Sequence, residues 1–207
     1  SQGEDYLEVS YLTGTLGNIQ LNRGLYEQAE ETFRRGLAIR LRRLKPDHPR
    51  IPVAHMNIST ALLGQENWEG ACAELALAQD VLERTQAADD GRLGFTFMKQ
   101  GICQFHLGRL DEALDSSERG RAILSKRFGP QHSFVAEALT TEAQIHDARD
   151  NVQVAAERFE QAVAAWALQP PNSQLGQRAL ASAREFAQRR GVEIPGLAPE
   201  ANGAANP

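Results

Sequence analysis

The sequence predicts an all-α solenoid of four helix-turn-helix units followed by a C-terminal capping helix. The main observation is a short segment that recurs at a constant interval. "GLYEQAEETF" begins at Gly24, "ENWEGACAEL" at Glu66, "GRLDEALDSS" at Gly108 and "DNVQVAAERF" at Asp150, so each start lies 42 residues after the previous one. Alanine is abundant and aromatic residues make up only 6% of the chain, which favours helices over strands. A constant period of this length is typical of stacked repeats.

Each recurring segment predicts the second helix of a unit. The four segments share an alanine, here called the turn alanine: Ala29, Ala71, Ala113 and Ala155. Four positions later stand Phe33, Leu75, Ser117 and Phe159, and seven positions later stand Gly36, Ala78, Gly120 and Ala162. Spacings of four and seven residues lie on one face of a helix. The small residues on this face allow another helix to approach closely.

The first helix of each unit lies upstream of the turn alanine, as in "YLEVSYLTGTLGNIQLNRG" (6–24) and "LGFTFMKQGICQFHLG" (93–108). Gly24 and Gly108 follow the expected ends of these helices, where a left-handed residue is common. Glu66 and Asp150 replace that glycine, so their turns must either avoid the left-handed conformation or adopt it with strain. Neither helix can bury its apolar stripe alone, which predicts that the units stack on one another.

The period stops after Trp166, and this marks the predicted domain boundaries: repeats over 1–167, a linker and capping helix over 168–190, and a tail over 191–207. The segment 173–190 has a narrow apolar stripe at Leu175, Ala179, Ala183 and Phe186. The tail is rich in Gly, Pro, Ala and Asn, which favours a disordered linker. The alternative is that its apolar residues, Val192, Ile194, Pro195 and Leu197, lie against a repeat surface or support self-association.

Composition and charge argue against several classes of partner. The formal net charge is −5, and the basic segment 39–45 is expected to end a helix, so we expect no nucleic-acid binding. No run of about 18 apolar residues is present and no signal peptide is recognised, so we expect no membrane partner and a cytoplasmic location. Cys72 and Cys103 stand among small residues in helical patterns and are expected to be reduced thiols that fill packing gaps.

No set of residues predicts catalysis or metal binding. The five histidines form no metal-ligand spacing, and no phosphate-binding loop or nucleophile motif is present. His48 and His132 lie 84 residues apart in equivalent loops, where we expect them to cap or pack against helices. We therefore expect no enzymatic activity, no metal and no cofactor.

Several of these motifs together resemble the tetratricopeptide repeat. The Leu16-Gly17 and Gln100-Gly101 pairs end twelve residues before a turn alanine, and the turn pattern Gly-x-x-x-x-Ala follows them. The 42-residue period and the loops "KPDHPRIPVA" (45–54) and "GPQHSFVAEAL" (129–139) resemble the kinesin-light-chain subtype, which is also common in the sensor arms of NLR-like signalling NTPases. The resemblance implies a right-handed solenoid with a concave groove that binds a protein or peptide.

The groove residues that the resemblance implies are Asn18, Asn22, Met56, Asn57, Thr60, Met98, Lys99, Phe105, His106 and Gln144. Asparagine side chains both donate to and accept from a peptide backbone, whereas methionine and phenylalanine offer apolar contacts. The carboxylate clamp of chaperone-binding relatives is incomplete, because Gly14 and Phe95 stand where it needs lysine. Two roles remain open: an adaptor that joins proteins, and the ligand-sensing arm of a larger NLR-like NTPase.

Overall fold

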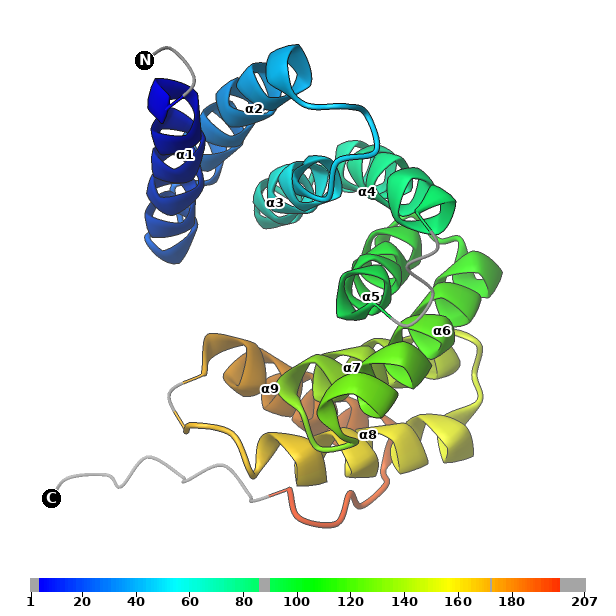
Figure 1. Ribbon diagram of the computed structural model, residues 1–207. Helices are drawn as coiled ribbons and strands as arrows, with labels where there is room; N and C mark the ends of the chain where they lie inside the picture. Colours follow the sequence, from blue (N-terminus) through cyan, green and yellow to red (C-terminus); the bar gives the residue numbers. More distant parts are fainter. Residues whose placement is uncertain (1–3, 86–89, 172, 198–207) are drawn as a thin grey trace, which may run out of the picture.

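In the computed structural model, residues 4–85, 90–171 and 173–197 are described, and all regular structure among them is α-helical. The helices are α1 Glu4–Asn22, α2 Tyr26–Arg43, α3 Arg50–Gly64, α4 Trp68–Arg84, α5 Gly91–His106, α6 Leu110–Phe128, α7 Ser133–Ala148, α8 Val152–Trp166 and α9 Gln174–Arg190. Consecutive helices pair into units that stack along a curved path, with α1, α3, α5, α7 and α9 on its concave side (Figure 1). The predicted all-α repeat fold is confirmed.

Small residues in the recurring segments lie where the two helices of a unit pack together. Ala29, Ala71, Ala113 and Ala155 are all fully buried. The pairing of α5 with α6 is especially tight, because a Cβ atom on Gly120 would lie 2.6 Å from the backbone nitrogen of Met98. The alternation of small and large residues in the recurring segments therefore sets how closely the two helices of a unit approach.

The turn between the two helices of a unit has the same geometry in all four units. Gly24, Glu66, Gly108 and Asp150 have φ angles of 72°, 59°, 73° and 61°. In each unit the next backbone N–H donates to the carbonyl five residues earlier. These hydrogen bonds run from Leu25 to Gln20, from Asn67 to Leu62, from Arg109 to Gln104 and from Asn151 to His146. Glu66 and Asp150 therefore adopt the left-handed conformation with strain, which costs about 1–2 kcal/mol for a residue with a Cβ atom.

The helix α9 is the first helix of a fifth, incomplete unit. Gly191, with φ of 65°, ends α9, and Val192 donates its N–H to the carbonyl of Ala187, which repeats the turn geometry of the earlier units. Gly191 follows Asp150 by 41 residues instead of 42, and this shift of one residue hides the relationship in the sequence. The turn geometry of the earlier units thus recurs once after α9, one residue out of step with the 42-residue period, and the predicted domain boundaries at 167 and 190 stay a prediction. Pro195 stands where a second helix would continue, and proline disfavours a helix interior.

The start of the tail packs against the last repeat. Ile194 is buried in a cluster with Phe159 and Val163 of α8, and Val192 and Leu197 pack against the same cluster. These contacts agree with the alternative in which the tail lies against a repeat surface, on α8 and α9 and outside the concave groove. The remaining tail residues lie outside the described part of the chain, so self-association through the tail stays a prediction.

A disulfide joins neighbouring units. Cys72 of α4 and Cys103 of α5 are bonded, with their Cα atoms 5.9 Å apart. The expectation of two reduced thiols is therefore wrong. Cys72 follows a turn alanine by one residue, and Cys103 precedes the next by ten. Stacking brings these two positions together, although neither is unusual within its own helix.

The loop histidines have the expected structural role. The Nδ1 atom of His48 accepts the N–H of Arg50 and that of His132 accepts the N–H of Phe134, both at 3.2 Å. His132 thereby caps the start of α7. Within the ranges given above, no helix combines the length and hydropathy needed to cross a membrane.

Candidate peptide-binding groove

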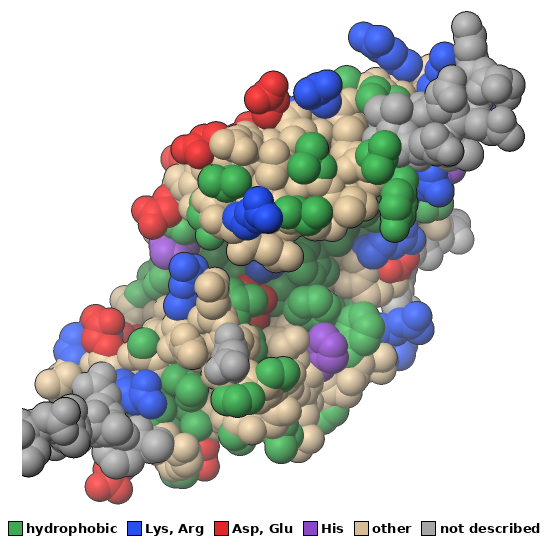
Figure 2. Space-filling view, turned by 90° about the vertical axis from the view of Figure 1, so that its left-hand side faces the viewer, with side chains coloured by type: hydrophobic (Ala, Val, Ile, Leu, Met, Phe, Trp, Pro, Cys, Tyr) green, Lys and Arg blue, Asp and Glu red, His purple; other side chains and the backbone are tan. Residues whose placement is uncertain are grey.

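The concave wall is formed by four positions in each first helix, here called groove positions. They lie 18, 14, 11 and 7 residues before the turn alanine, or before Gly196 in α9. In the order α1, α3, α5, α7 and α9, the position 18 residues before holds Tyr11, Val53, Phe95, Glu137 and Arg178, and the position 14 before holds Thr15, Asn57, Lys99, Thr141 and Ser182. The position 11 before holds Asn18, Thr60, Ile102, Gln144 and Glu185, and the position 7 before holds Asn22, Gly64, His106, Ala148 and Arg189. Figure 2 shows the wall as a hollow between the two arms of the molecule, with hydrophobic side chains inside it.

The N-terminal half of the groove is polar but uncharged. Asn18 and Asn22 of α1 are exposed, and Asn57 and Thr60 of α3 are half-buried. Thr60 donates its hydroxyl to the carbonyl of Met56 at 3.0 Å, whereas the asparagine amides stay available. These four predicted residues therefore share one surface that can donate to and accept from a peptide backbone.

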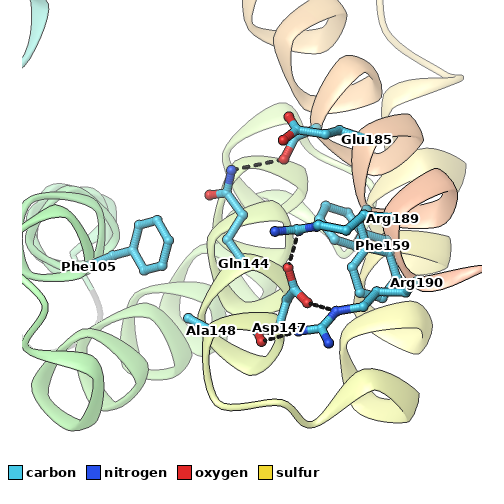
Figure 3. Close-up of a pocket in the computed structure, with 10 residues that line it drawn as sticks. Phe105, Gln144, Asp147, Ala148, Phe159, Glu185, Arg189 and Arg190 are labelled. Carbon is cyan, nitrogen blue, oxygen red and sulfur yellow. Dashed lines mark hydrogen bonds and ion pairs between the residues drawn. The ribbon is translucent and has the colours of Figure 1, made fainter.

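The C-terminal half of the groove is deeper and contains two pockets between α5, α7 and α9. The first has a volume of about 380 Å³, and Figure 3 shows Phe105 facing α7 and α9 across it. The second has a volume of about 210 Å³. Its apolar lining comes from Ile102, Trp166 and Leu175, with Arg178 at its edge. Both pockets thus combine apolar side chains with a polar rim.

Gln144 lies between the two pockets and lines both of them. Its Nε2 donates to the hydroxyl of Ser182 on α9 at 3.0 Å and so links α7 to α9. The sequence pattern identified Gln144 but missed the contribution of α9, including Arg178, Ser182 and Arg189. A search that allowed a one-residue gap in the period would have found it.

Most charges in the deeper half are already paired. Asp147, at the floor of the first pocket, forms ion pairs with Arg189 and Arg190 (Figure 3). Lys99 forms a 2.7 Å ion pair with Glu137 across α5 and α7, and its side chain is only 11% exposed. Lys99 therefore does not offer a free cation to a ligand carboxylate, so the groove is suited to apolar anchors with neutral or weakly charged neighbours.

Two predicted groove residues, Met98 and Met56, lie elsewhere than expected. Met98 is fully buried and Met56 is 9% exposed, so both belong mainly to the core between helices. Position 15 before the turn alanine faces the second helix of the same unit, and this one-residue difference separates Met56 and Met98 from Asn57 and Lys99 at the next position. His106 stacks on Trp68 with ring centroids 3.8 Å apart, and burial lowers its pKa.

The described ranges contain no group of three or more His, Cys, Asp or Glu side chains arranged to hold a metal ion. The buried glutamates belong to ion pairs between helices instead. The arrangement in the groove is one of hydrogen-bonding amides, apolar pockets and paired charges, which suits reversible binding of a chain segment.

Comparison with known proteins agrees with this geometry. Residues 92–167 match the family model described as tetratricopeptide repeat. This part of the chain belongs to the tetratricopeptide-repeat family. The matched range covers the third and fourth units, whose turns were predicted from Gly108 and Asp150. No curated protein shows significant sequence similarity to the chain.

Solved structures with the same fold include kinesin-light-chain-like repeat proteins. A Podospora anserina protein, described as a kinesin light chain with nearly identical TPR-like repeats, superposes with a TM-score of 0.67 at 20% identity, covering 88% of each chain. BtubC (BKLC) from P. vanneervenii gives a TM-score of 0.72 at 14% identity, covering 91% of this chain and 76% of that one. At these identities the likeness concerns the fold of the repeat array.

Proposed function

We propose that this tetratricopeptide-repeat protein is a non-enzymatic scaffold that binds an extended segment of a partner protein in its concave groove. The observation that carries the proposal is the pair of pockets on either side of the Gln144–Ser182 hydrogen bond. An extended peptide directs alternate side chains in opposite directions, so two neighbouring pockets can each take one anchor. The amide-rich wall of α1 and α3 would hold the backbone beyond them.

The lining indicates which side chains would enter. Ile102, Trp166 and Leu175 favour an aliphatic or aromatic anchor in the smaller pocket. In the larger pocket Asp147 already forms ion pairs with Arg189 and Arg190, so a charged side chain of the ligand would have to compete with them. We therefore propose a ligand with two apolar residues separated by a short polar spacer.

We propose an adaptor role in a protein complex, because the groove runs over five helices and leaves the convex side free for a second contact. The alternative is the ligand-sensing arm of an NLR-like NTPase. The two roles differ in what is attached: a neighbouring nucleotide-binding domain in the complete gene product would support the sensor, and a coiled coil would support the adaptor.

The proposed cytoplasmic location has a direct test. Disulfides are rare in reducing compartments, and the Cys72–Cys103 bond therefore weighs against the location that the sequence suggested. Alkylation of free thiols in intact cells, followed by mass spectrometry of the two cysteines, would measure their redox state. Fully alkylated cysteines are the result expected for a cytoplasmic protein.

The binding proposal is tested with peptides selected from a random display library on the purified protein. We expect selected peptides to share two apolar residues and to bind Phe105→Ala at least tenfold more weakly, since loss of a central anchor commonly costs more than 1 kcal/mol. Asn57→Ala should weaken binding through lost backbone contacts. Titration calorimetry on each variant measures both effects.

The matched control is Glu160→Lys, an exposed position on α8 outside both pockets. Equal affinities for the wild type, Phe105→Ala, Asn57→Ala and Glu160→Lys would place binding on the loops or the convex face and would contradict the groove proposal.

A further inference from the structure

The helix α1 exposes a row of large apolar side chains. Leu12, Leu16 and Ile19 are 62%, 50% and 45% exposed. Their spacings of four and three residues place them on one face of the helix. These residues occupy what we call the stacking positions, which lie 17, 13 and 10 residues before the turn alanine Ala29.

The stacking positions are buried in every other first helix. Their twelve equivalents in α3, α5, α7 and α9 are at most 8% exposed. At the middle position, Ile58, Gln100, Glu142 and Ala183 are covered where Leu16 is not. The exposed residues of α1 therefore belong to the helix face that is buried in every first helix with a preceding unit beside it, and they are not scattered surface leucines.

The covered faces show what the middle stacking position needs. Its neighbour stands eight residues after the turn alanine of the preceding unit. Gln100 bonds to Gln79 at 2.8 Å, and Glu142 pairs with Arg121 at 2.6 Å. Ile58 shares an apolar cluster with Leu37. The middle residue therefore contacts a side chain of matching chemistry in each case: amide with amide, carboxylate with guanidinium, and aliphatic with aliphatic. By the same rule we expect Leu16 to contact an aliphatic side chain.

Among the described residues, a second copy of the chain offers a matching apolar row on its own α1. The second helices α2, α4, α6 and α8 are already covered by α3, α5, α7 and α9. Among the large apolar residues that the described chain exposes, a row of three on one helix face occurs in α1 alone. An antiparallel pair of α1 helices would place Leu16 against Leu16 and Leu12 against Ile19.

Charge favours the same pairing. Residues 11–22 of α1 contain no Lys, Arg, Asp or Glu, although 24% of the chain is charged. A twofold contact brings identical residues together, and a charged face would then repel its copy. This uncharged helix face avoids that repulsion.

We propose that two copies of this protein associate through the stacking positions of α1, around a twofold axis near Leu16. The stacking positions are separate from the groove positions of α1, so the dimer joins two arrays end to end and leaves both grooves open. It would present two copies of the groove to a partner with two binding segments, which raises apparent affinity without new contacts.

The test is sedimentation equilibrium of the purified chain over a range of concentrations. We expect the wild type to sediment as a dimer, and Leu16→Glu and Leu16→Lys each to sediment as a monomer. Mixing the two variants should restore a 1:1 dimer, because the Arg121–Glu142 pair shows that this position tolerates an ion pair. The matched control is Leu77→Glu on α4, which is 52% exposed and should leave the dimer intact.

Leu12→Lys provides a second disruption should Leu16→Glu lose helicity by circular dichroism. A wild type that stays monomeric at every concentration would overturn the proposal, as would a dimer that survives both Leu16 variants. Two monomeric variants that fail to associate when mixed would exclude the twofold contact at Leu16. Binding of display-selected peptides should be unchanged in Leu16→Glu, so failure of the groove proposal and failure of the dimer are separate results.

Discussion

Consecutive units meet at contacts that we call joints. The first and third joints each bury a glutamate beside basic side chains, and the pKa values of the two carboxyl groups are shifted in opposite directions. At the first joint, Glu74 of α4 is held by His55 of α3 at 2.7 Å and by Arg34 of α2 at 3.0 Å. Burial works to raise the pKa of Glu74, but the hydrogen bond from His55 and the charge of Arg34 together lower it below its usual value.

At the third joint, Glu142 of α7 lies between Arg121 of α6 at 2.6 Å and Arg158 of α8 at 3.1 Å. Its side chain is completely buried, whereas that of Glu74 is 12% exposed. Burial therefore outweighs both arginines and raises the pKa of Glu142. Glu74 stands on a second helix and Glu142 on a first helix, and the deeper burial of Glu142 shifts its pKa in the opposite direction.

The largest expected effect comes from removing one partner at the third joint. Arg121→Met should destabilise the array by about 3–5 kcal/mol, because it leaves the buried Glu142 with weaker compensation. The double variant Arg121→Gln with Glu142→Gln copies the amide pair Gln79–Gln100 of the second joint and should be close to neutral. Urea unfolding measures both. If Arg121→Met were as stable as the double variant, the ion pair between Arg121 and Glu142 would not be needed to compensate the burial of Glu142.

The second joint differs from both, because a disulfide closes it. Reduction of Cys72–Cys103, or the variant Cys72→Ala with Cys103→Ala, should lower stability by about 2–4 kcal/mol. The loss should be greatest where α4 meets α5, since each repeat contacts only its neighbours. Hydrogen exchange with and without reductant measures this distribution. Uniform loss of protection across all units would contradict local coupling.

A smaller effect distinguishes the two glutamates by pH. The lowered pKa of Glu74 gives stability that is present above its unfolded pKa, near 4.5, and is lost as the pH falls through the folded value. The raised pKa of Glu142 works the other way, so its contribution falls as the pH rises above about 4.5. Glu74→Gln should therefore reduce the loss of stability in acid, and Glu142→Gln should reduce the loss toward neutral pH. Thermal melts from about pH 2 to pH 7 cover both ranges, and slopes of the same sign for the two glutamates would refute the comparison.

Predictions from the sequence succeeded where one helix was enough to define them. The turn alanines are fully buried and the loop histidines accept backbone N–H groups as expected. They failed where one residue of helix rotation decided the outcome, since Met56 lies in the core and its neighbour Asn57 is half-buried on the groove wall. A step of one residue turns a side chain by about 100°, so small errors in alignment exchange core and surface.

The sequence by itself determined the repeat architecture, because the 42-residue period and the residue sizes around each turn alanine are local properties. Only the tertiary structure decided what meets across the joints. The Cys72–Cys103 bond, the Glu142 ion pairs and the contact of Gln144 with Ser182 all join residues of different units. Their identities follow from how the units rotate against one another, and that rotation is set by packing over the whole interface rather than by any single segment.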